Sequence, residues 1–291
     1  METLFGHQDE VVDVAALAQE RCLSVGARDR TARLWKVVEE TQLVFRGGGG
    51  DKKPRKLDKD RPAAPTFTEG SIDRIAMIDE EMFVTGSDNG SLSLWIIHKK
   101  KPVFTVPIAH GLDPALKPDE ASAEKDPDPK VPSPPQPRWI TALATIPYSD
   151  LIISGSWDGW IRVWKVSEDK RRIETVREVG KLNKRDKTED VLMANGDATT
   201  EPEPVEAVGE EEEQLIKGVI NDISVFERGD RGKDGLCIIA AVGREHRLGR
   251  WKKMKGKNGA VVLEVPSRSR PVAENLVDEH EGLLEVDEEL H

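Results

Sequence analysis

His7 and Asp29 are the residues of this 291-residue chain that most suggest acid–base chemistry. A histidine next to a carboxylate can exchange protons near neutral pH. The chain has no glycine-rich phosphate loop, no paired Cys or His at metal-ligand spacing, and no Ser, His and Asp grouping outside one repeated motif. Because His7 and Asp29 occupy positions of that motif, we expect them to belong to a buried hydrogen-bond chain. The sequence therefore predicts a binding protein that is not an enzyme and has no cofactor, metal or small-molecule substrate.

The repeated motif consists of two short strands, a tight turn and a closing tryptophan. In its clearest copy, residues 154–164, apolar and polar residues alternate around Asp158-Gly159, a pair suited to a hairpin turn. Further copies cover residues 26–35, 86–95 and 242–251. Val25 stands where Thr85 and Ser154 offer a hydroxyl, so we expect the first hydrogen-bond set to be incomplete. The motif assigns structural roles to His7, Asp29, Trp35, Asn89, Trp95, His110, Asp158, Trp164, Glu245 and Trp251.

Four hairpins with a terminal tryptophan resemble WD40 repeats, each of which supplies four antiparallel strands to one blade of a β-propeller. The four tryptophans lie 60, 69 and 87 residues apart, which exceeds a repeat of about 40 to 45 residues. Segments 48–65, 111–137 and 181–214 are Gly-, Pro- or acid-rich, and their removal leaves spacings of 42, 42 and 53. We therefore expect these segments to be disordered insertions on the face that carries the hairpin turns.

The predicted fold is all-β: WD40 propeller blades over residues 1–270 and an acidic tail over 271–291. Apolar runs at 11–17, 72–78, 140–146 and 219–225 are the expected inner strands of the four blades. A last strand is expected at 261–265. WD40 rings usually have about seven blades, and the first repeat opens almost at residue 1. We therefore expect the four blades to be part of a seven-bladed ring, with a chain that closes as a four-bladed ring as the alternative.

Charge is distributed unevenly along the chain. Residues 111–137, 185–214 and 272–291 together carry −20 of a net charge of −11, which leaves +9 for the remainder. A basic body with acidic appendages can bind a polyanion despite the acidic total. The two cysteines, Cys22 and Cys237, lie in apolar runs and are expected in the core. No segment is apolar and long enough to span a bilayer, so no membrane partner is expected.

Two segments could carry targeting or partner-binding functions. Lys52, Lys53, Arg55 and Lys56 resemble a short nuclear-import signal, with a plain solvated loop as the alternative. The tail alternates acids with leucine and valine, so it is either a partner-binding amphipathic segment or an unstructured solvating tail.

The fourth repeat, residues 243–253, departs from the general WD40 pattern and resembles one family, the WD40 subunit of the U-three small nucleolar ribonucleoprotein (snoRNP). Its most specific part is the run from Glu245 to Trp251, and segments 42–45, 70–73, 90–95, 99–102, 109–111 and 139–141 agree. The resemblance implies a nuclear, nucleolar scaffold of a box C/D snoRNP that binds the box B/C element of the U-three snoRNA. It also implies a kink-turn-binding protein and other snoRNP and small-subunit processome proteins as partners, in pre-rRNA processing and small ribosomal subunit biogenesis.

Six residues are candidates for contact with RNA: Arg28, Arg30, Trp157, Arg244, His246 and Arg247. The basic side chains would neutralise phosphates. The Trp157 indole would stack on an unpaired base, or it merely covers a turn. The rival hypothesis is a peptide-binding WD40 adaptor such as a ubiquitin-ligase substrate receptor. Many such adaptors place an acid directly after the closing tryptophan, where this chain has Lys36, Ile96, Lys165 and Lys252.

Overall fold

The computed structural model describes residues 3–16, 18, 20–47, 67–122, 124, 128, 133–180 and 216–266. The import candidates Lys52, Lys53, Arg55 and Lys56 lie outside the described residues, as do segments 48–65 and 181–214 and the tail 271–291. The described chain is almost entirely β-structure, with one short α-helix, α1 (Pro118–Ala121), and one 3-10 turn, η2 (Asp230–Gly232). No helix in these ranges is long and apolar enough to cross a membrane.

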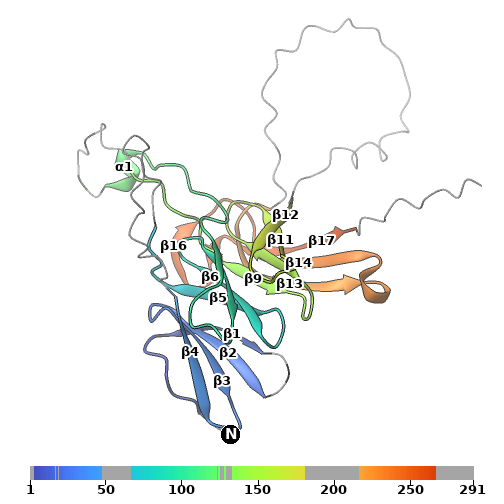
Figure 1. Ribbon diagram of the computed structural model, residues 1–291. Coiled ribbons are helices and arrows are strands. Elements are labelled where there is room, and N and C mark those ends of the chain that lie inside the picture. The colour runs from blue at the N-terminus through green and yellow to red at the C-terminus, as the bar shows by residue number, and fades with distance from the viewer. Residues whose placement is uncertain are drawn as a thin grey trace, which may run out of the picture.

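The strands form four antiparallel sheets that follow one another along the chain, together with a separate two-stranded hairpin (Figure 1). The first sheet contains β1 (Val11–Ala16), β2 (Arg21–Gly26), β3 (Thr31–Lys36) and β4 (Thr41–Arg46). The second contains β5 (Ile72–Met77), β6 (Met82–Ser87), β7 (Leu92–Ile96) and β8 (Phe104–Val106). The third contains β9 (Ala142–Thr145), β10 (Leu151–Gly155), β11 (Ile161–Val166) and β12 (Ile173–Val179). The fourth contains β13 (Val219–Arg228), β14 (Gly235–Gly243) and β17 (Gly259–Val265), and the hairpin joins β15 (Glu245–His246) to β16 (Gly249–Lys253).

The first three sheets have the strand order expected of WD40 blades. Each strand pairs with the next along the chain, from an inner strand (β1, β5 or β9) to an outer one (β4, β8 or β12). The inner strands coincide with the apolar runs that the sequence singled out. The prediction of an all-β WD40 architecture is therefore confirmed, because alternating short strands with tight turns can bury their apolar residues by stacking as blades.

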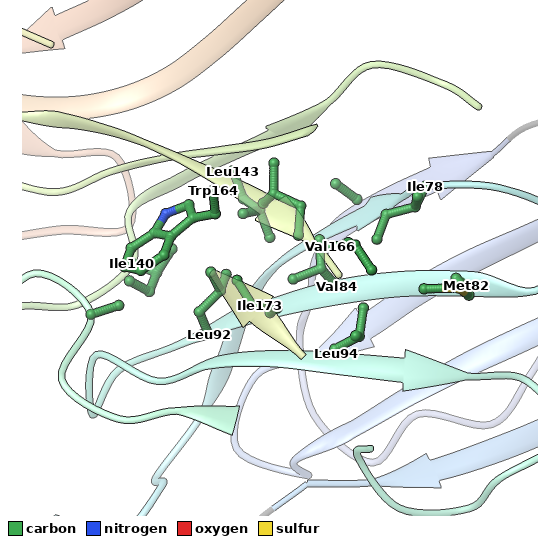
Figure 2. Close-up of a cluster of buried hydrophobic side chains, with 13 residues drawn as sticks. Ile78, Met82, Val84, Leu92, Leu94, Ile140, Leu143, Trp164, Val166 and Ile173 are labelled. Atoms are coloured by element: carbon green, nitrogen blue, oxygen red, sulfur yellow. The ribbon is translucent and has the colours of Figure 1, made fainter. Parts of the chain in front are cut away.

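Adjacent sheets pack face to face, with one hydrophobic cluster in each gap. Between the second and third sheets, Val84 and Leu94 pack with Trp164 and Val166 (Figure 2). Similar clusters join the first sheet to the second through Phe45 and the third to the fourth. Because β5 and β6 lie between two neighbouring sheets, all their residues are buried. The middle sheets thus depend on both neighbours for their apolar burial.

The first and fourth sheets each have a less covered face. Val14 of β1 is 58% exposed, and Val262 of β17 is 59% exposed. Val11 and Phe226 are also large apolar residues with half-exposed side chains. Exposed apolar faces at the two ends of a series of blades are what an open arc would present. That the four blades are part of a seven-bladed ring stays a prediction.

The fourth sheet differs from the prediction in its strand pairing. β14 pairs with β17 over Leu236 to Val242, whereas Gly249–Lys253 pairs only with Glu245–His246 in the separate hairpin. Glu245 and Trp251 therefore do not occupy the aspartate and tryptophan positions of a fourth blade, and their assignment to the structural motif was wrong. The physical reason is that β17 supplies alternating Val261, Leu263 and Val265 to the core. The segment Gly249–Lys253, in contrast, contains only one large apolar residue.

Close packing between sheets generates a prediction at Gly155 of β10. A Cβ atom at this position would lie 2.7 Å from Ile220 Cγ2 and 3.0 Å from Ile223 Cδ1, across the gap to the fourth sheet. We expect Gly155→Ala to lower the free energy of unfolding by about 1–3 kcal/mol, because the extra methyl overpacks a filled gap. Urea denaturation measures this change.

The matched control is Gly259→Ala, because a Cβ at Gly259 meets nothing within 4 Å. That variant should change the stability by less than about 1 kcal/mol. Equal losses in the two variants would show that the gap between the third and fourth sheets is not tightly packed.

Candidate nucleic-acid interface

The first blade contains a complete hydrogen-bond chain. The Trp35 Nε1–H donates to Ser24 Oγ at 2.7 Å, and Ser24 Oγ lies 2.7 Å from His7 Nε2. The other ring nitrogen, Nδ1, lies 2.7 Å from Asp29 Oδ2. The expectation that Val25 leaves this set without a hydroxyl was wrong, because the preceding residue, Ser24, points to the tryptophan and supplies it. The set is satisfied internally, so His7 and Asp29 are used in holding the blade together.

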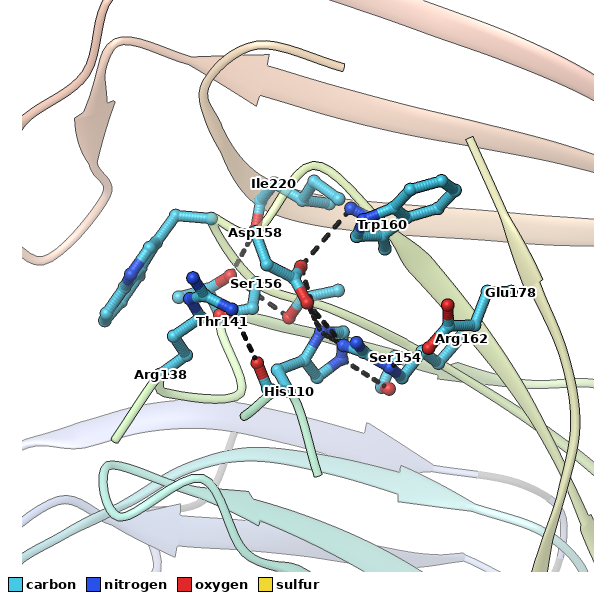
Figure 3. Close-up of polar contacts among 12 residues, drawn as sticks. His110, Arg138, Thr141, Ser154, Ser156, Asp158, Trp160, Arg162, Glu178 and Ile220 are labelled. Carbon is cyan, nitrogen blue, oxygen red and sulfur yellow. Dashed lines mark hydrogen bonds and ion pairs between the residues drawn. The ribbon is translucent and has the colours of Figure 1, made fainter. Parts of the chain in front are cut away.

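The third blade repeats the chain in a buried setting, and Figure 3 shows its Ser154, His110 and Asp158 members. The Trp164 Nε1–H donates to Ser154 Oγ at 2.8 Å, and Ser154 Oγ lies 2.8 Å from His110 Nε2. His110 Nδ1 lies 3.0 Å from Asp158 Oδ2. Burial lowers the pKa of His110 despite the nearby Asp158 carboxylate. Burial alone would raise the pKa of Asp158, but hydrogen bonds and charge from His110 and Arg162 outweigh it and hold that pKa below its usual range.

The second blade carries a variant of the same network. The Trp95 Nε1–H donates to Thr85 Oγ1 at 2.9 Å, and Asn89 Oδ1 accepts the Ser91 N–H at 3.0 Å. Glu69 stands in place of the histidine and accepts a hydrogen bond from Ser87 Oγ at 2.7 Å. Within the part of the chain that the structure describes, no group of His, Cys, Asp and Glu is arranged to hold a metal ion. The motif residues thus form structural networks inside three blades.

The β15–β16 hairpin joins blades that are distant in sequence. Arg247 donates from Nη1 to the Val12 carbonyl at 3.1 Å and from Nη2 to the Asp73 carbonyl at 3.0 Å. Its own backbone N–H donates to Asn221 Oδ1 at 2.8 Å. Arg247, a candidate for phosphate contact, therefore has its guanidinium bound to inner strands of the first and second sheets. Its geometry favours a structural role.

His246 points into the protein. Its side chain is buried, and its ring packs edge-on against Trp139 with 5.8 Å between centroids. Burial, together with the neighbouring charges of Arg247 and Arg74, lowers the pKa of His246 to about 4. The imidazole is therefore neutral near pH 7, so the expected contact between a charged His246 and a phosphate is not supported.

Arg74 and Asp73 of β5 form a centre that the sequence analysis missed. Arg74 Nε donates to the Thr141 carbonyl at 2.6 Å, and the same guanidinium lies 3.6 Å from Asp13 Oδ2 and 3.4 Å from Asp222 Oδ1. Arg74 also donates to the Asn221 carbonyl. Burial raises the pKa of Asp73 to about 6. The sequence does contain a feature that could have identified this centre. Two charged residues lie inside an otherwise apolar inner strand, where each buried charge needs a partner.

Trp157 lies in a polar cluster and has little exposed surface. It is 6% exposed, and its Nε1–H donates to Asp113 Oδ1 at 3.0 Å. Arg138 Nε donates to the same oxygen at 2.8 Å, and Lys252 Nζ binds the other carboxylate oxygen. The Lys252 ammonium also lies 4.2 Å from the centroid of the Trp157 ring. The expected use of Trp157 as an exposed stacking platform was wrong, because the indole is covered.

Asp113 belongs to the segment 111–137 that was expected to be disordered. Burial alone would raise its pKa, but hydrogen bonds from Lys252, Arg138 and Trp157 lower it, so the carboxylate is charged. The two ends of the segment also meet, because the Asp113 N–H donates to the Gln136 carbonyl at 2.8 Å. The ends of this segment are therefore packed on the body, which contradicts the expectation for those residues.

Four of the six RNA candidates are exposed, but the guanidinium of one of them, Arg247, is already bound to the Val12 and Asp73 carbonyls. Arg28 and Arg30 lie in the turn between β2 and β3, and Arg244 lies directly after β14. Arg30 Nη1 lies 3.5 Å from the Glu69 carbonyl, and the backbone N–H of Arg244 donates to Asn258 Oδ1 at 2.8 Å. Contact between these side chains and RNA stays a prediction.

Comparisons with known proteins place the chain among WD40 proteins. The family model described as WD domain, G-beta repeat matches residues 1–36 and 134–165. A WD repeat-containing protein of Schizosaccharomyces pombe is 47% identical over 267 residues, which cover 91% of this chain and 43% of that protein. Ribosomal RNA-processing protein 9 of Saccharomyces cerevisiae is 40% identical over 275 residues, which cover 86% of this chain and 42% of the yeast protein.

Further similarities concern a human protein and a solved structure. U3 small nucleolar RNA-interacting protein 2 of Homo sapiens is 31% identical over 206 residues, which cover 70% of this chain and 31% of the human protein. The structure of U3-55K matches with a TM-score of 0.59 and 30% identity, over 90% of this chain and 57% of that chain. The chain thus spans less than half the length of the curated relatives that it matches.

The Asp113 cluster generates a stability prediction. Asp113→Ala should lower the free energy of unfolding by about 1–3 kcal/mol, because Arg138, Lys252 and the Trp157 N–H lose a partly buried acceptor. Chemical denaturation tests this, with Asp230→Ala as the control. The Asp230–Lys233 pair has side chains 76% and 80% exposed at 4.0 Å, so its loss should cost less than about 1 kcal/mol. Similar effects of the two substitutions would argue against the cluster as an anchor.

The low pKa of His246 generates a pH prediction. The unfolded chain binds a proton at His246 as the pH falls below about 6.5, whereas the folded chain does so only near its pKa of about 4. Folding stability should therefore fall across this window, by up to about 1.4 kcal/mol per pH unit from this group.

His246→Gln should remove that contribution, so the stability difference between the wild type and the variant should change between pH 7 and pH 4.5. Denaturation curves at several pH values measure it. His98→Gln, at an exposed histidine, is the control. A pH-independent difference for His246→Gln would contradict the prediction.

Proposed function

Because this chain is a WD40-repeat homologue of yeast ribosomal RNA-processing protein 9 and human U3 small nucleolar RNA-interacting protein 2, we propose that it is a non-catalytic scaffold that binds U3 snoRNA. The observation that carries this proposal is the similarity to a human protein named for its interaction with U3 small nucleolar RNA, over 70% of this chain. The similarity to a yeast protein named for ribosomal RNA processing supports a role in pre-rRNA processing and small ribosomal subunit biogenesis.

The finer parts of the proposal concern the binding site and partners. The box B/C region of U3 snoRNA would be the RNA element, bound beside a kink-turn-binding protein and other box C/D snoRNP and small-subunit processome proteins. Such an assembly places the protein in the nucleus and nucleolus. Among the six candidates, we assign phosphate contact to Arg28, Arg30 and Arg244, because their side chains are exposed and the guanidinium of Arg247 is bound to the Val12 and Asp73 carbonyls.

The geometry gives no support to the alternative of a peptide-binding adaptor. The residues after the closing tryptophans of the three complete blades are Lys36, Ile96 and Lys165, so the acid expected of the ubiquitin-ligase receptors is lacking. The exposed residues of the turn between β2 and β3, Arg28 and Arg30, are both basic, which fits a polyanionic ligand.

The test is binding of the whole chain to a box B/C RNA and to a scrambled RNA of equal length, measured over a range of salt concentrations. We expect preference for box B/C and a logarithm of affinity that falls linearly with the logarithm of salt. Arg28→Gln with Arg30→Gln should reduce the salt slope by about one to two for both RNAs. The control, Arg171→Gln with Arg172→Gln, removes the same charge from exposed residues of the β11–β12 turn.

Equal affinity for both RNAs would contradict specific recognition of box B/C by this chain. If the two double variants show the same salt slope of RNA affinity, the arginines of the first hairpin turn do not contact RNA. Binding to RNA that does not change with salt would remove the electrostatic basis of the proposal.

A further inference from the structure

Three of the four inner strands contain a β-bulge near their beginning. In β1, β5 and β13, the pairing register shifts across one extra residue, which is Val12, Asp73 and Asn221 respectively. Each of these residues follows a Val or Ile, and Thr141 follows Ile140 in the same way directly before β9. The extra residue of a bulge lacks a partner in the neighbouring strand. The backbone carbonyls of Val12, Asp73, Thr141 and Asn221, which we call the bulge carbonyls, therefore need donors from elsewhere.

Arg247, in the turn of the β15–β16 hairpin, binds the first two bulge carbonyls. Its Nη1 donates to the Val12 carbonyl at 3.1 Å, and its Nη2 donates to the Asp73 carbonyl at 3.0 Å. The hairpin itself is held at the fourth sheet. Asn221 Oδ1 accepts the Arg247 N–H at 2.8 Å, and Asn221 Nδ2 donates to the Glu245 carbonyl at 2.9 Å. One arginine thus connects the last sheet of the series to the first two.

Arg74 of β5 binds the other two bulge carbonyls. Its Nε donates to the Thr141 carbonyl at 2.6 Å, and its Nη2 donates to the Asn221 carbonyl. The same guanidinium lies 3.6 Å from Asp13 Oδ2 of β1 and 3.4 Å from Asp222 Oδ1 of β13. Arg74 therefore reaches from the second sheet to the three others, including the fourth, which is not its neighbour.

These bonds supply connections that the apolar packing lacks. Each of the three hydrophobic clusters joins only two neighbouring sheets. Apolar packing is non-directional, so it resists the separation of two sheets more than a change in the angle between them. A planar guanidinium that donates to two carbonyls in fixed directions restricts that angle.

The two arginines differ in their exposure to water. The Arg74 side chain is 7% exposed, whereas Arg247 belongs to the exposed residues. Breaking the Arg74 bonds would leave a buried charge and two carbonyls without partners, which is strongly unfavourable. Water can replace the partners of Arg247 at a much lower free-energy cost. One link is therefore permanent, and the other can be released.

We propose that Arg74 and Arg247 form a clamp that sets the curvature of the series of blades, in which Arg74 is the permanent part and Arg247 is the releasable part. The clamp makes the position of the β15–β16 hairpin and the order of the first sheet interdependent. A ligand that draws the hairpin outward must break the Arg247 bonds and thereby loosens β1, whereas a ligand that holds the hairpin in place tightens it. This inference does not depend on which ligand the protein binds.

The first test is hydrogen–deuterium exchange of the whole chain, followed by mass spectrometry, for Arg247→Lys and Arg74→Lys. Lysine keeps the positive charge, but its ammonium does not reproduce the two fixed donor directions of a guanidinium. Arg247→Lys should speed exchange in β1 about 10-fold, as expected for the loss of one hydrogen bond to a charged group, and leave β9 unchanged. Arg74→Lys should speed exchange in β9 and β13.

The matched control is Arg162→Lys. The Arg162 side chain is 14% exposed and pairs with Asp158 and Glu178, all within the third blade. This variant should speed exchange in the third blade alone. Thermal melting verifies that each variant is folded. If Arg74→Lys does not fold, Asp222→Asn replaces it, because that change removes a 68% exposed partner of the same guanidinium.

A distance measurement tests the curvature directly. Nitroxide labels at Glu39→Cys and Asp230→Cys, two exposed turn residues of the first and fourth sheets, report the distance between the ends of the series by electron–electron double resonance. Cys22 and Cys237 are replaced by Ala in this background. The chain with its native arginines should give one narrow distribution, and Arg247→Lys should broaden it toward longer distances.

Three results would overturn the clamp. Unchanged exchange of β1 and an unchanged distance distribution in Arg247→Lys would show that the hairpin does not hold the first sheet. Equal broadening in Arg162→Lys would show that weakening any blade loosens the series. Unchanged exchange of β9 and β13 in the Arg74 variant would show that Arg74 does not link these strands. Each of these results leaves the proposed function untouched, because none of the measurements involves a ligand.

Discussion

The arrangement of the blades depends on satisfying polar groups at the inner strands, which are packed between neighbouring sheets. A polar group buried there must find a partner inside the protein, because an unpaired group costs about 1–3 kcal/mol. Thr141 Oγ1 donates to the Ile220 carbonyl at 2.6 Å, and Arg74 Nε donates to the Thr141 carbonyl at 2.6 Å. Arg247 extends the network to the first sheet through the Val12 carbonyl. Hydrogen bonds between inner strands thus add a directional link to the non-directional apolar packing of the sheets.

This network contains one uncompensated group. Asp73 accepts a hydrogen bond from Ser71 Oγ at 2.8 Å, but its Oδ2 atom is buried without a hydrogen-bond partner among the described residues. The raised pKa of Asp73, about 6, follows from that burial. The charges of Arg247 and Arg74 act in the opposite direction and partly offset the cost. The centre of the arc is therefore held by charged groups whose balance depends on pH.

The segment after β14 links this structural centre to the outer surface. Arg247, His246 and Lys252 point inward, to the inner strands, to Trp139 and to Asp113 respectively. Arg244 and Lys253 lie on the outer side. Lys252 and Lys253 are neighbours in β16, where successive side chains point to opposite faces, so one short segment can fasten the blades and present cations. The structural residues hold the outward ones in place, which reduces the entropy lost on binding a ligand.

The sequence by itself determined the strands and turns of the first three blades and most of their motif hydrogen-bond partners, because these depend largely on residues near one another in the chain. Alternating apolar residues, the Asp158-Gly159 turn and the closing tryptophans predicted the blades, and the charge distribution predicted a basic body. The tertiary structure decided which long-range partners meet. β17, and not Gly249–Lys253, pairs with β14 and supplies Val261, Leu263 and Val265 to the apolar cluster of the fourth sheet. The Asp113 carboxylate accepts a hydrogen bond from Trp157, and the Val12 and Asp73 carbonyls accept hydrogen bonds from Arg247. These outcomes depend on carbonyls and carboxylates brought together from separate blades, which no local pattern of residues specifies.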